Sequence, residues 1–418
     1  MNVLRDFRYA IRVLLKDWGL SSVTVVTLGL GIGVNAAIFS IVDSVLLRPL
    51  AVKDPDRVTM LYRQQNSGSL TNTFSVPDFE DLRSQANELF SDLFGYRLLL
   101  NGMSAGGKTE LIVTNAVTGN YFSGLGIKPA LGRIILPSEG KIAGADPVIV
   151  LSYSFWKTRF AGDPAVLDRT IVLDGYPMRI VGVTPQRFNG TYPVNLVQAY
   201  MPIGMAATLT RSRDFMTNRK QRDLVLFGTI RPQVKAQRAL AILSSVATNL
   251  SREFPDIDKN LAILPFPERR TRLGDPRKGS AVVVSGLFLI LAGLVLLLAC
   301  GNIANLLLVR SMARSREMAV RSALGAHRAH LLRQLLIESF VLALAGGGVG
   351  VLIGRLATLV LGQVDFQLSL PMHLDFSLDS RVFAYAFGVT ALCGLLTGVI
   401  PAIRGSRLDL AHALRETD

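Results

Sequence analysis

AVVVSGLFLILAGLVLLLACGNIANLLLV, residues Ala281–Val309, holds no charged side chain over 29 consecutive positions. A helix of about 20 apolar residues matches the hydrocarbon thickness of a bilayer, so this stretch predicts a membrane span. Two other uncharged runs have a similar length, Leu20–Val42 and Val382–Ile403. Several such runs in one chain are unusual for a soluble protein and favour an integral membrane protein.

A fourth apolar run, Leu335–Leu361, contains Glu338 near its start and Arg355 near its end. Both positions are close enough to a membrane interface for the charge to reach water or a partner. Half of the 418 residues are hydrophobic and only 18% are charged. We therefore predict four transmembrane helices.

The net charge of +14 suits either nucleic-acid binding or a membrane protein with basic cytoplasmic loops. We see no RNA-binding or zinc-binding signature, which favours membrane lipid over nucleic acid as the partner. The two cysteines, Cys300 and Cys393, lie in apolar runs and are expected to be small core residues. The four histidines are scattered along the chain, so no metal site is predicted.

Lys and Arg residues predict the orientation, because short loops rich in them stay in the cytoplasm. Residues 1–17 carry four, residues 310–333 carry six and the C-terminal tail carries three, whereas residues 362–380 carry none. Both termini are therefore expected to be cytoplasmic, with residues 43–279 on the outer side.

The predicted fold is an integral membrane protein with four transmembrane α-helices in a 1 + 3 arrangement and a large α+β domain inserted between spans 1 and 2. Its expected parts are residues 1–19 (a cytoplasmic amphipathic helix), 20–42 (span 1), 43–279 (the outer domain), 280–403 (three further spans, with a cytoplasmic helix at 310–326) and 404–418 (a cytoplasmic tail). The segment Phe7–Trp18 suits a helix on the inner membrane face, although a plain basic flank explains it equally well.

In the outer domain, strand and helix patterns alternate. Ser75 is expected to cap a helix opened by Pro77 and Asp78. A second amphipathic helix is expected over Lys235–Phe254, with Leu240, Leu243, Ala247, Leu250 and Phe254 on its apolar stripe. Strands are expected at Val58–Tyr62, Pro147–Leu151, Leu224–Ile230 and Leu261–Phe266, with a hairpin over Ile171–Val183 that turns at Asp174–Gly175.

Residues 120–220 are a candidate inserted subdomain. We find no catalytic constellation in this domain, which favours a binding or force-transmitting role.

One motif points to a different function. Gly102–Thr109, GMSAGGKT, fits the phosphate-binding pattern G-x-x-x-x-G-K-[ST]. A true phosphate-binding loop leads into a helix, whereas Glu110–Val117 has the composition of a strand. On the predicted outer side ATP is not available. We therefore interpret the motif as a Gly-rich hairpin turn after Leu98–Asn101.

Glycines spaced four apart mark the third span, at Gly346, Gly350 and Gly354. This spacing makes a smooth ridge for close helix packing, within one chain or between two. Asn302 and Asn305, near the inner end of the second span, are candidates to hydrogen-bond a neighbouring helix.

Several runs together carry a family resemblance. They are RSREMAVRSALGA (residues 314–326), GGGVGVLIG (346–354) and PAIRGSRLDLAHALR (401–415). In this order they resemble the permease region of the macrolide-exporter and cell-division permease superfamily of ABC systems. The runs LGIGVNAAIFSIVDSVLLRPL (30–50) and DPDRV (54–58) resemble more narrowly the acidobacterial duplicated orphan permease type. Chains of that type carry two permease units, whereas this sequence has one, so it is either half of a longer chain or a single-unit subunit.

The resemblance implies an ABC transporter permease of the bacterial inner membrane with a periplasmic core domain. Such permeases dimerise, as homodimers or heterodimers, and sit on a separate cytosolic ABC ATPase dimer that binds the ATP. The permease itself is then no enzyme and holds no cofactor. The implied activity is mechanotransmission for efflux or for handling lipoprotein and envelope substrates, in some members with a periplasmic adaptor and an outer-membrane channel. The coupling residues carried over by motif are Arg314, Arg316, Glu317, Met318, Arg321, Leu324 and Gly325.

Two other functions remain open at this point. A membrane-anchored sensor or scaffold would bind a periplasmic partner without a nucleotide cycle. A membrane enzyme would need a catalytic set assembled from distant residues.

Overall fold

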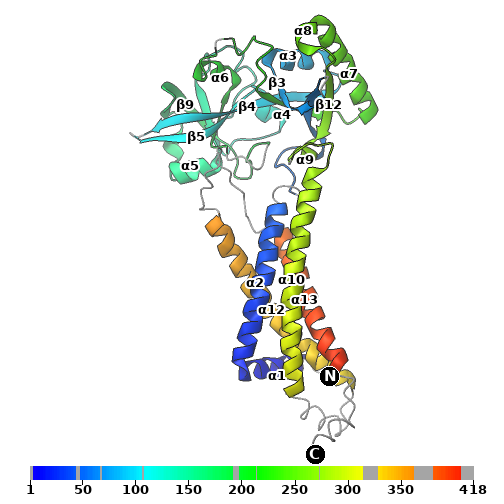
Figure 1. Cartoon of the computed structure of the whole chain (residues 1–418). Coiled ribbons are helices and arrows are strands. Elements are labelled where there is room, and N and C mark those ends of the chain that lie inside the picture. Colours follow the sequence, from blue (N-terminus) through cyan, green and yellow to red (C-terminus); the bar gives the residue numbers. More distant parts are fainter. Residues whose placement is uncertain are drawn as a thin grey trace, which may run out of the picture. The chain divides into compact units, whose positions relative to one another are not determined.

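The computed structural model describes residues 3–43, 48–65, 68–105, 108–191, 197–212, 214–272, 274–313, 328–361 and 380–405. They fall into two compact units, a helical unit and an α+β unit formed by residues 45–281 (Figure 1). The helical unit contains α1 (Val3–Lys16), α2 (Trp18–Val42), α10 (Ser280–Ala313), α12 (Arg328–Leu361) and α13 (Ser380–Gly405).

The long helices have the length and composition of membrane spans. Within the described residues, three stretches can cross a bilayer, Trp18–Ser40, Val282–Ile303 and Ile337–Leu356. The fourth helix, α13, contains the apolar stretch Arg381–Cys393. The 34 residues of α10 extend over about 51 Å, which exceeds the roughly 30 Å of the hydrocarbon core. The arrangement of one span, an α+β domain and further apolar helices confirms the predicted fold class.

The first helix, α1, is amphipathic. It buries Ala10 and Leu14, whereas Arg8, Arg12 and Lys16 are exposed. A turn at Asp17 separates the basic segment from α2, so this segment forms a helix of its own. Its predicted location on the inner membrane face stays a prediction.

In the described part of the α+β unit, the strands form one twelve-stranded sheet. The main strand order is β12-β1-β11-β4-β5-β10-β7-β9-β6, and β2, β3 and β8 pair at its sides. The strands are β1 (Val58–Gln64), β2 (Leu70–Thr71), β3 (Thr73–Phe74), β4 (Phe90–Ala105), β5 (Lys108–Val117), β6 (Leu131–Gly132), β7 (Val148–Leu151), β8 (Thr170–Leu173), β9 (Tyr176–Val183), β10 (Ala199–Pro202), β11 (Leu224–Ile230) and β12 (Ala262–Pro267). The helices are α3 (Val76–Gln85), α4 (Tyr121–Gly124), α5 (Tyr153–Arg159), α6 (Ile203–Leu209), α7 (Ala236–Glu253), α8 (Pro255–Asp258) and α9 (Glu268–Thr271).

The sheet carries a hydrophobic core on each face. Successive residues of β1 point to opposite sides, so Met60 joins one buried cluster and Leu61 the other. The cluster on the side of Met60 is rich in aromatic rings, among them Phe94, Tyr121 and Tyr200. The predicted strands at β1, β7, β11 and β12 and the hairpin of β8 and β9 are confirmed.

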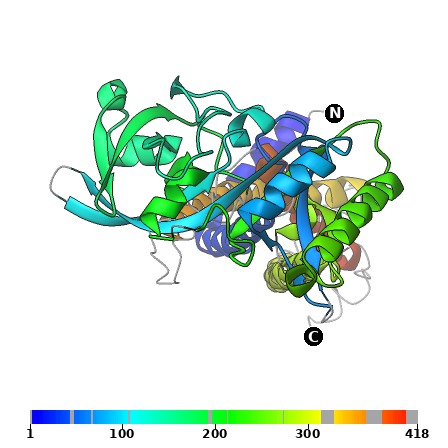
Figure 2. The same ribbon diagram turned by 90° about the horizontal axis from the view of Figure 1, so that it is seen from above.

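The glycine-rich motif lies in a β-hairpin. Strands β4 and β5 pair antiparallel through it, with Ser104 opposite Thr109 and Ala105 opposite Lys108. In Figures 1 and 2 this cyan hairpin extends outward from the rest of the sheet. The N–H of Gly102 donates to the carboxylate of Asp174 over 2.7 Å, a negative group where a phosphate would have to bind. The predicted hairpin is confirmed, but the turn is shorter than predicted, because β4 continues to Ala105 and β5 begins at Lys108.

Two helix predictions can be compared in detail. Ser75 caps α3 as expected and forms a capping box with Asp78, whose carboxylate accepts the Ser75 N–H. In α7 the predicted stripe is partly wrong, because Leu240 is 46% exposed. The buried face instead includes Ala239 and Val246, so the apolar stripe is rotated away from Leu240.

Candidate functional site

Close contact between glycines joins the first and third spans. A Cβ atom added to Gly350 of α12 would lie 3.0 Å from the carbonyl oxygen of Gly29 and 3.1 Å from the nitrogen of Gly33, both on α2. The contact is reciprocal, since a Cβ on Gly33 would lie 2.9 Å from the Gly350 oxygen. Gly346 meets Leu28 in the same way, at 2.6 Å. Only hydrogen atoms fit between these backbones, which is the geometry of GxxxG-type packing.

A buried amide ties three spans together. The Nδ2 of Asn35 on α2 donates to the carbonyl of Ala292 on α10 over 2.9 Å and to that of Gly31 over 3.0 Å. Its Oδ1 accepts from the hydroxyl of Tyr385 on α13 over 3.3 Å. An unpaired amide in hydrocarbon costs several kcal/mol, about 4 to 8 in the least polar media, so these bonds hold the helices in register.

The outer end of the same bundle adds two contacts. The ring of Tyr385 stacks on Phe39 of α2, with centroids 4.1 Å apart and planes within 5°. Asp43 follows α2 with a fully buried carboxylate, which lies 3.6 Å from the guanidinium of Arg381 on α13. A buried acid is stable only with such a partner, so α2 and α13 are linked by charge as well as packing.

The outer domain holds a buried ion pair close to the two segments that connect it to the helices, one after α2 and one before α10. Arg272 is fully buried and makes two bonds of 2.7 Å to the carboxylate of Glu268. It also donates to the carbonyl of Arg48 over 2.8 Å. Arg48 is the sixth residue after α2, and Arg272 lies eight residues before α10. This pair therefore clamps the chain that leaves span 1 to the chain that enters span 2.

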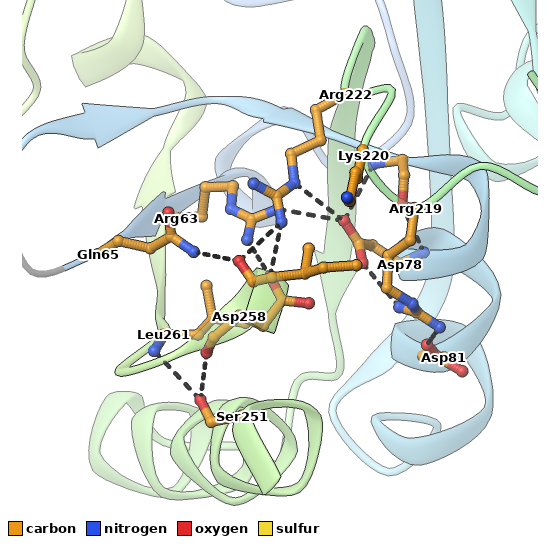
Figure 3. A network of polar contacts seen from close by, with 12 residues as sticks. Arg63, Gln65, Asp78, Asp81, Arg219, Lys220, Arg222, Ser251, Asp258 and Leu261 are labelled. Atoms are coloured by element: carbon orange, nitrogen blue, oxygen red, sulfur yellow. Dashed lines mark hydrogen bonds and ion pairs between the residues drawn. The ribbon is translucent and has the colours of Figure 1, made fainter. Parts of the chain in front are cut away.

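A second network, of arginine and aspartate side chains, joins β1, α3 and α8 (Figure 3). Arg63 of β1 sits between two buried carboxylates, Asp78 of α3 at 3.2 Å and Asp258 of α8 in a shorter contact. Arg222 reaches the same Asp258 oxygen at 2.7 Å, and Arg219 bridges Asp78 and Asp81. Burial, together with the nearby Arg63, lowers the pKa of Arg222, although Asp258 and Asp78 act to raise it.

This network is balanced in charge, because three arginines meet three aspartates. It holds α8, and with it the end of α7, against β1 and α3. Among the residues described, no group of three or more His, Cys, Asp or Glu is placed to bind a metal ion. Each of the network's carboxylates is instead occupied by a guanidinium, so the site is suited to rigidity and not to acid–base chemistry.

Comparison with known families decides the class of protein. Residues 21–246 match the MacB-like periplasmic core domain, and residues 289–410 match the FtsX-like permease C-terminal. The first match alone covers more than half of the chain. The chain belongs to the ABC-transporter permeases with a MacB-like periplasmic core.

Relatives of this permease cover it to different extents. YknZ of Bacillus subtilis, described as an uncharacterized ABC transporter permease, is 23% identical over 433 residues, covering 99% of this chain and all of the relative. The macrolide export ATP-binding/permease protein MacB of Bartonella quintana is 27% identical over 301 residues. That alignment covers 70% of this chain and 41% of MacB, so the permease spans about two fifths of that relative.

Solved structures are also similar to part of the permease. The periplasmic region of MacB from Actinobacillus actinomycetemcomitans aligns with a TM-score of 0.37 at 17% identity, covering 50% of this chain and 88% of that one. The extracellular domain of YknZ from Gram-positive bacteria gives 0.37 at 13% identity, covering 50% and 99%.

The predicted site residues of the permease fall into three groups. The coupling residues Arg314, Arg316, Glu317, Met318, Arg321, Leu324 and Gly325 lie outside the described residues. The ridge of Gly346, Gly350 and Gly354 faces α2 of the same chain, with Gly354 in ordinary contact at 3.6 Å. Asn302 and Asn305 are exposed on α10, whereas Ile303 between them is buried.

Sequence reasoning missed Asn35, whose side chain bonds to both α10 and α13. Asn35 is the single amide in the uncharged run Leu20–Val42, and a polar group at such a position is itself a signal. It also missed that Gly29 and Gly33 repeat the four-residue spacing of α12. The cysteines were predicted as core residues, and Cys300 and Cys393 are indeed buried in one cluster between α2, α10 and α13.

Proposed function

We propose that this permease is the membrane subunit of an ABC-type system in which a separate cytosolic ATPase dimer drives conformational work in the periplasm. Membership of the permease family supports an ATPase partner. The observation that carries the proposal beyond the family is the clamp of Arg272, Glu268 and the Arg48 carbonyl. Because it joins the segment that follows span 1 to the segment that precedes span 2, we expect a displacement of one span against the other to load this buried ion pair and so to reach the domain.

The proposal includes an orientation and a docking site. Both termini lie in the cytoplasm of a bacterial inner membrane, and residues 314–325 form the helix that contacts the ATPase. The permease subunit binds no nucleotide, since the only motif that we identified for it lies in the β4–β5 hairpin. Two permease units, identical or different, form the working dimer, and within the family we assign the acidobacterial duplicated orphan type on the runs at 30–50 and 54–58.

The work done outside is efflux or the handling of lipoprotein and envelope substrates, with a periplasmic adaptor and outer-membrane channel as further partners. MacB relatives carry the description of macrolide export, which supports efflux as the first activity to test.

The test is ATPase stimulation in reconstituted membranes. The permease is co-purified with its bound ATPase, and hydrolysis is compared among wild type, Glu317→Lys and Arg321→Glu. We expect both variants to insert normally and to lose the stimulation. Stimulation that survives both changes would show that the docking helix is wrongly assigned. If no ATPase co-purifies with the wild type, the sensor or scaffold function would replace the proposal.

A further inference from the structure

A cavity of about 650 Å³ lies against one face of the sheet in the periplasmic domain. Its floor includes Met60 and Tyr62 of β1 and Tyr96 of β4. One wall is formed by residues 68–70 with Asn72 just beyond them, and the other wall is the segment 274–278, which precedes α10 in the chain. This volume is typical of sites for small molecules and exceeds what a single water or inorganic ion needs.

The two walls are bonded to each other. Arg277 donates to the carbonyl of Gly68 across the cavity over 3.1 Å. Its guanidinium also makes two bonds to Asp275, at 2.9 and 3.2 Å, and these bonds lower the pKa of the Asp275 carboxyl. Arg277 therefore joins the two walls of the cavity, and its charge is compensated by Asp275.

One positive charge remains at the rim. Lys278 lines the cavity and is exposed, and it takes part in none of the ion pairs found among the described residues. Asp275 is the single acidic residue among the described lining residues, and it is already paired with Arg277. The lining consequently carries a net charge of about one positive unit, which favours an anionic ligand.

The position of Lys278 in the chain restricts where that anion comes from. Lys278 is four residues before Val282, where the candidate span begins, so the backbone keeps it within about 14 Å of that span. Basic residues that flank a span attract anionic lipid head groups, so a lipid is one source of such an anion.

The floor adds an aromatic surface. Tyr62 and Tyr96 are 7% and 4% exposed, and their rings are fixed by neighbours. Tyr62 packs edge-on against Phe266, and Tyr96 stacks on Phe227 at 6.0 Å. Only the edges of these two rings reach the cavity, so they give the glycerol part of a ligand a small rigid contact while its anionic end reaches Lys278.

We propose that this cavity binds a glycerol phosphate ester, either as the head group of an anionic phospholipid or as a soluble phosphate ester. The site is separate from the nucleotide coupling proposed above, and its test needs no ATPase.

The experiment uses the full chain in nanodiscs that contain phosphatidylglycerol with a photoreactive diazirine in the head group. Cross-linked peptides are mapped by mass spectrometry. We expect labelling to concentrate on the peptides that contain residues 60–72 and 271–278. Labelling should fall at least fivefold in Lys278→Glu, which reverses the rim charge, and in Asn72→Trp, which fills the cavity without changing charge. Lys259→Glu, an exposed lysine outside the cavity, is the matched control and should label as wild type does.

Soluble glycerol 3-phosphate separates the two sources. Labelling that persists in its presence identifies the lipid head group as the ligand, whereas displacement identifies a soluble ester. The proposal is overturned if the label is spread over the domain, or if the two cavity variants label as strongly as Lys259→Glu.

Discussion

Replacing Gly350 with alanine tests the packing of the first and third spans directly. The new methyl group would lie 3.0 Å from the Gly29 oxygen, 3.1 Å from the Gly33 nitrogen and 3.0 Å from Cβ of Ile32. Ordinary contacts begin near 3.4 Å, and two of these three atoms belong to backbone that cannot rotate away. The helices must therefore separate by several tenths of an ångström, and overpacking of this kind costs about 1 to 3 kcal/mol.

Gly348→Ala is the matched control. Gly348 lies two residues earlier on the same helix, is exposed, and has no atom within 4 Å of the position that its new methyl group would take. Both substitutions gain the same helix propensity, about 1 kcal/mol, so the difference between the two variants isolates the clash. We expect Gly350→Ala to be the less stable of the two by about 1 to 3 kcal/mol.

Cysteine labelling reports on the helical unit alone. Cys300 and Cys393 are the only cysteines of the chain, and both are buried in the cluster beside α2. Their reaction with a maleimide during an SDS titration measures opening of the bundle. The expected difference corresponds to labelling about 5- to 150-fold faster in Gly350→Ala than in Gly348→Ala. Equal rates in the two variants would refute the close approach of α2 and α12.

Three further predictions address the other links. Arg272→Met leaves the buried carboxylate of Glu268 unpaired and should lower the free energy of thermal unfolding by about 3 to 5 kcal/mol. The double variant Arg272→Met with Glu268→Met should recover most of this loss. A double variant that is no more stable than the single variant would contradict the role of this ion pair. Asn35→Leu should cost about 0.6 to 1.7 kcal/mol in the SDS titration, and a stabilised variant would show that its bonds do not hold the spans. Copper–phenanthroline oxidation should link Cys300 to Cys393 within one chain, because both thiols are buried in the same small cluster between α10 and α13. Mass spectrometry that finds only links between chains would place α10 and α13 apart.

Short-range signals in the sequence predicted most of the elements. The capping box at Ser75 and the turn at Asp174–Gly175 depend on residues within four positions of one another. At the turn both residues have positive φ, 46° and 90°, the conformation that the hairpin requires. The spans were visible for a similar reason, since each is a continuous run whose composition alone decides its environment.

The long-range polar links were not predictable in this way. Asn35 and Ala292 are 257 positions apart, and Arg63 and Asp258 are 195 apart. Nothing in a single sequence states which of many arginines will meet which aspartate once the sheet has formed. The error at Leu240 has a related cause, because periodicity gives the width of an apolar stripe but only the packing partner fixes its centre.

The second span differs from the others in how it is held. Only 22% of the window Val282–Ile303 is buried within the chain, against 44% for Trp18–Ser40 and for Ile337–Leu356. Among the described residues, the bond from Asn35 to Ala292 links it to α2. The chain entering it, by contrast, is fixed by Arg272. A helix with few lateral contacts shifts along its axis at little cost in packing, so we infer that α10 is the more easily displaced of the two spans in the proposed mechanism. In the proposed dimer, its exposed face, with Asn302 and Asn305, is the surface that we expect to meet lipid or the second permease unit.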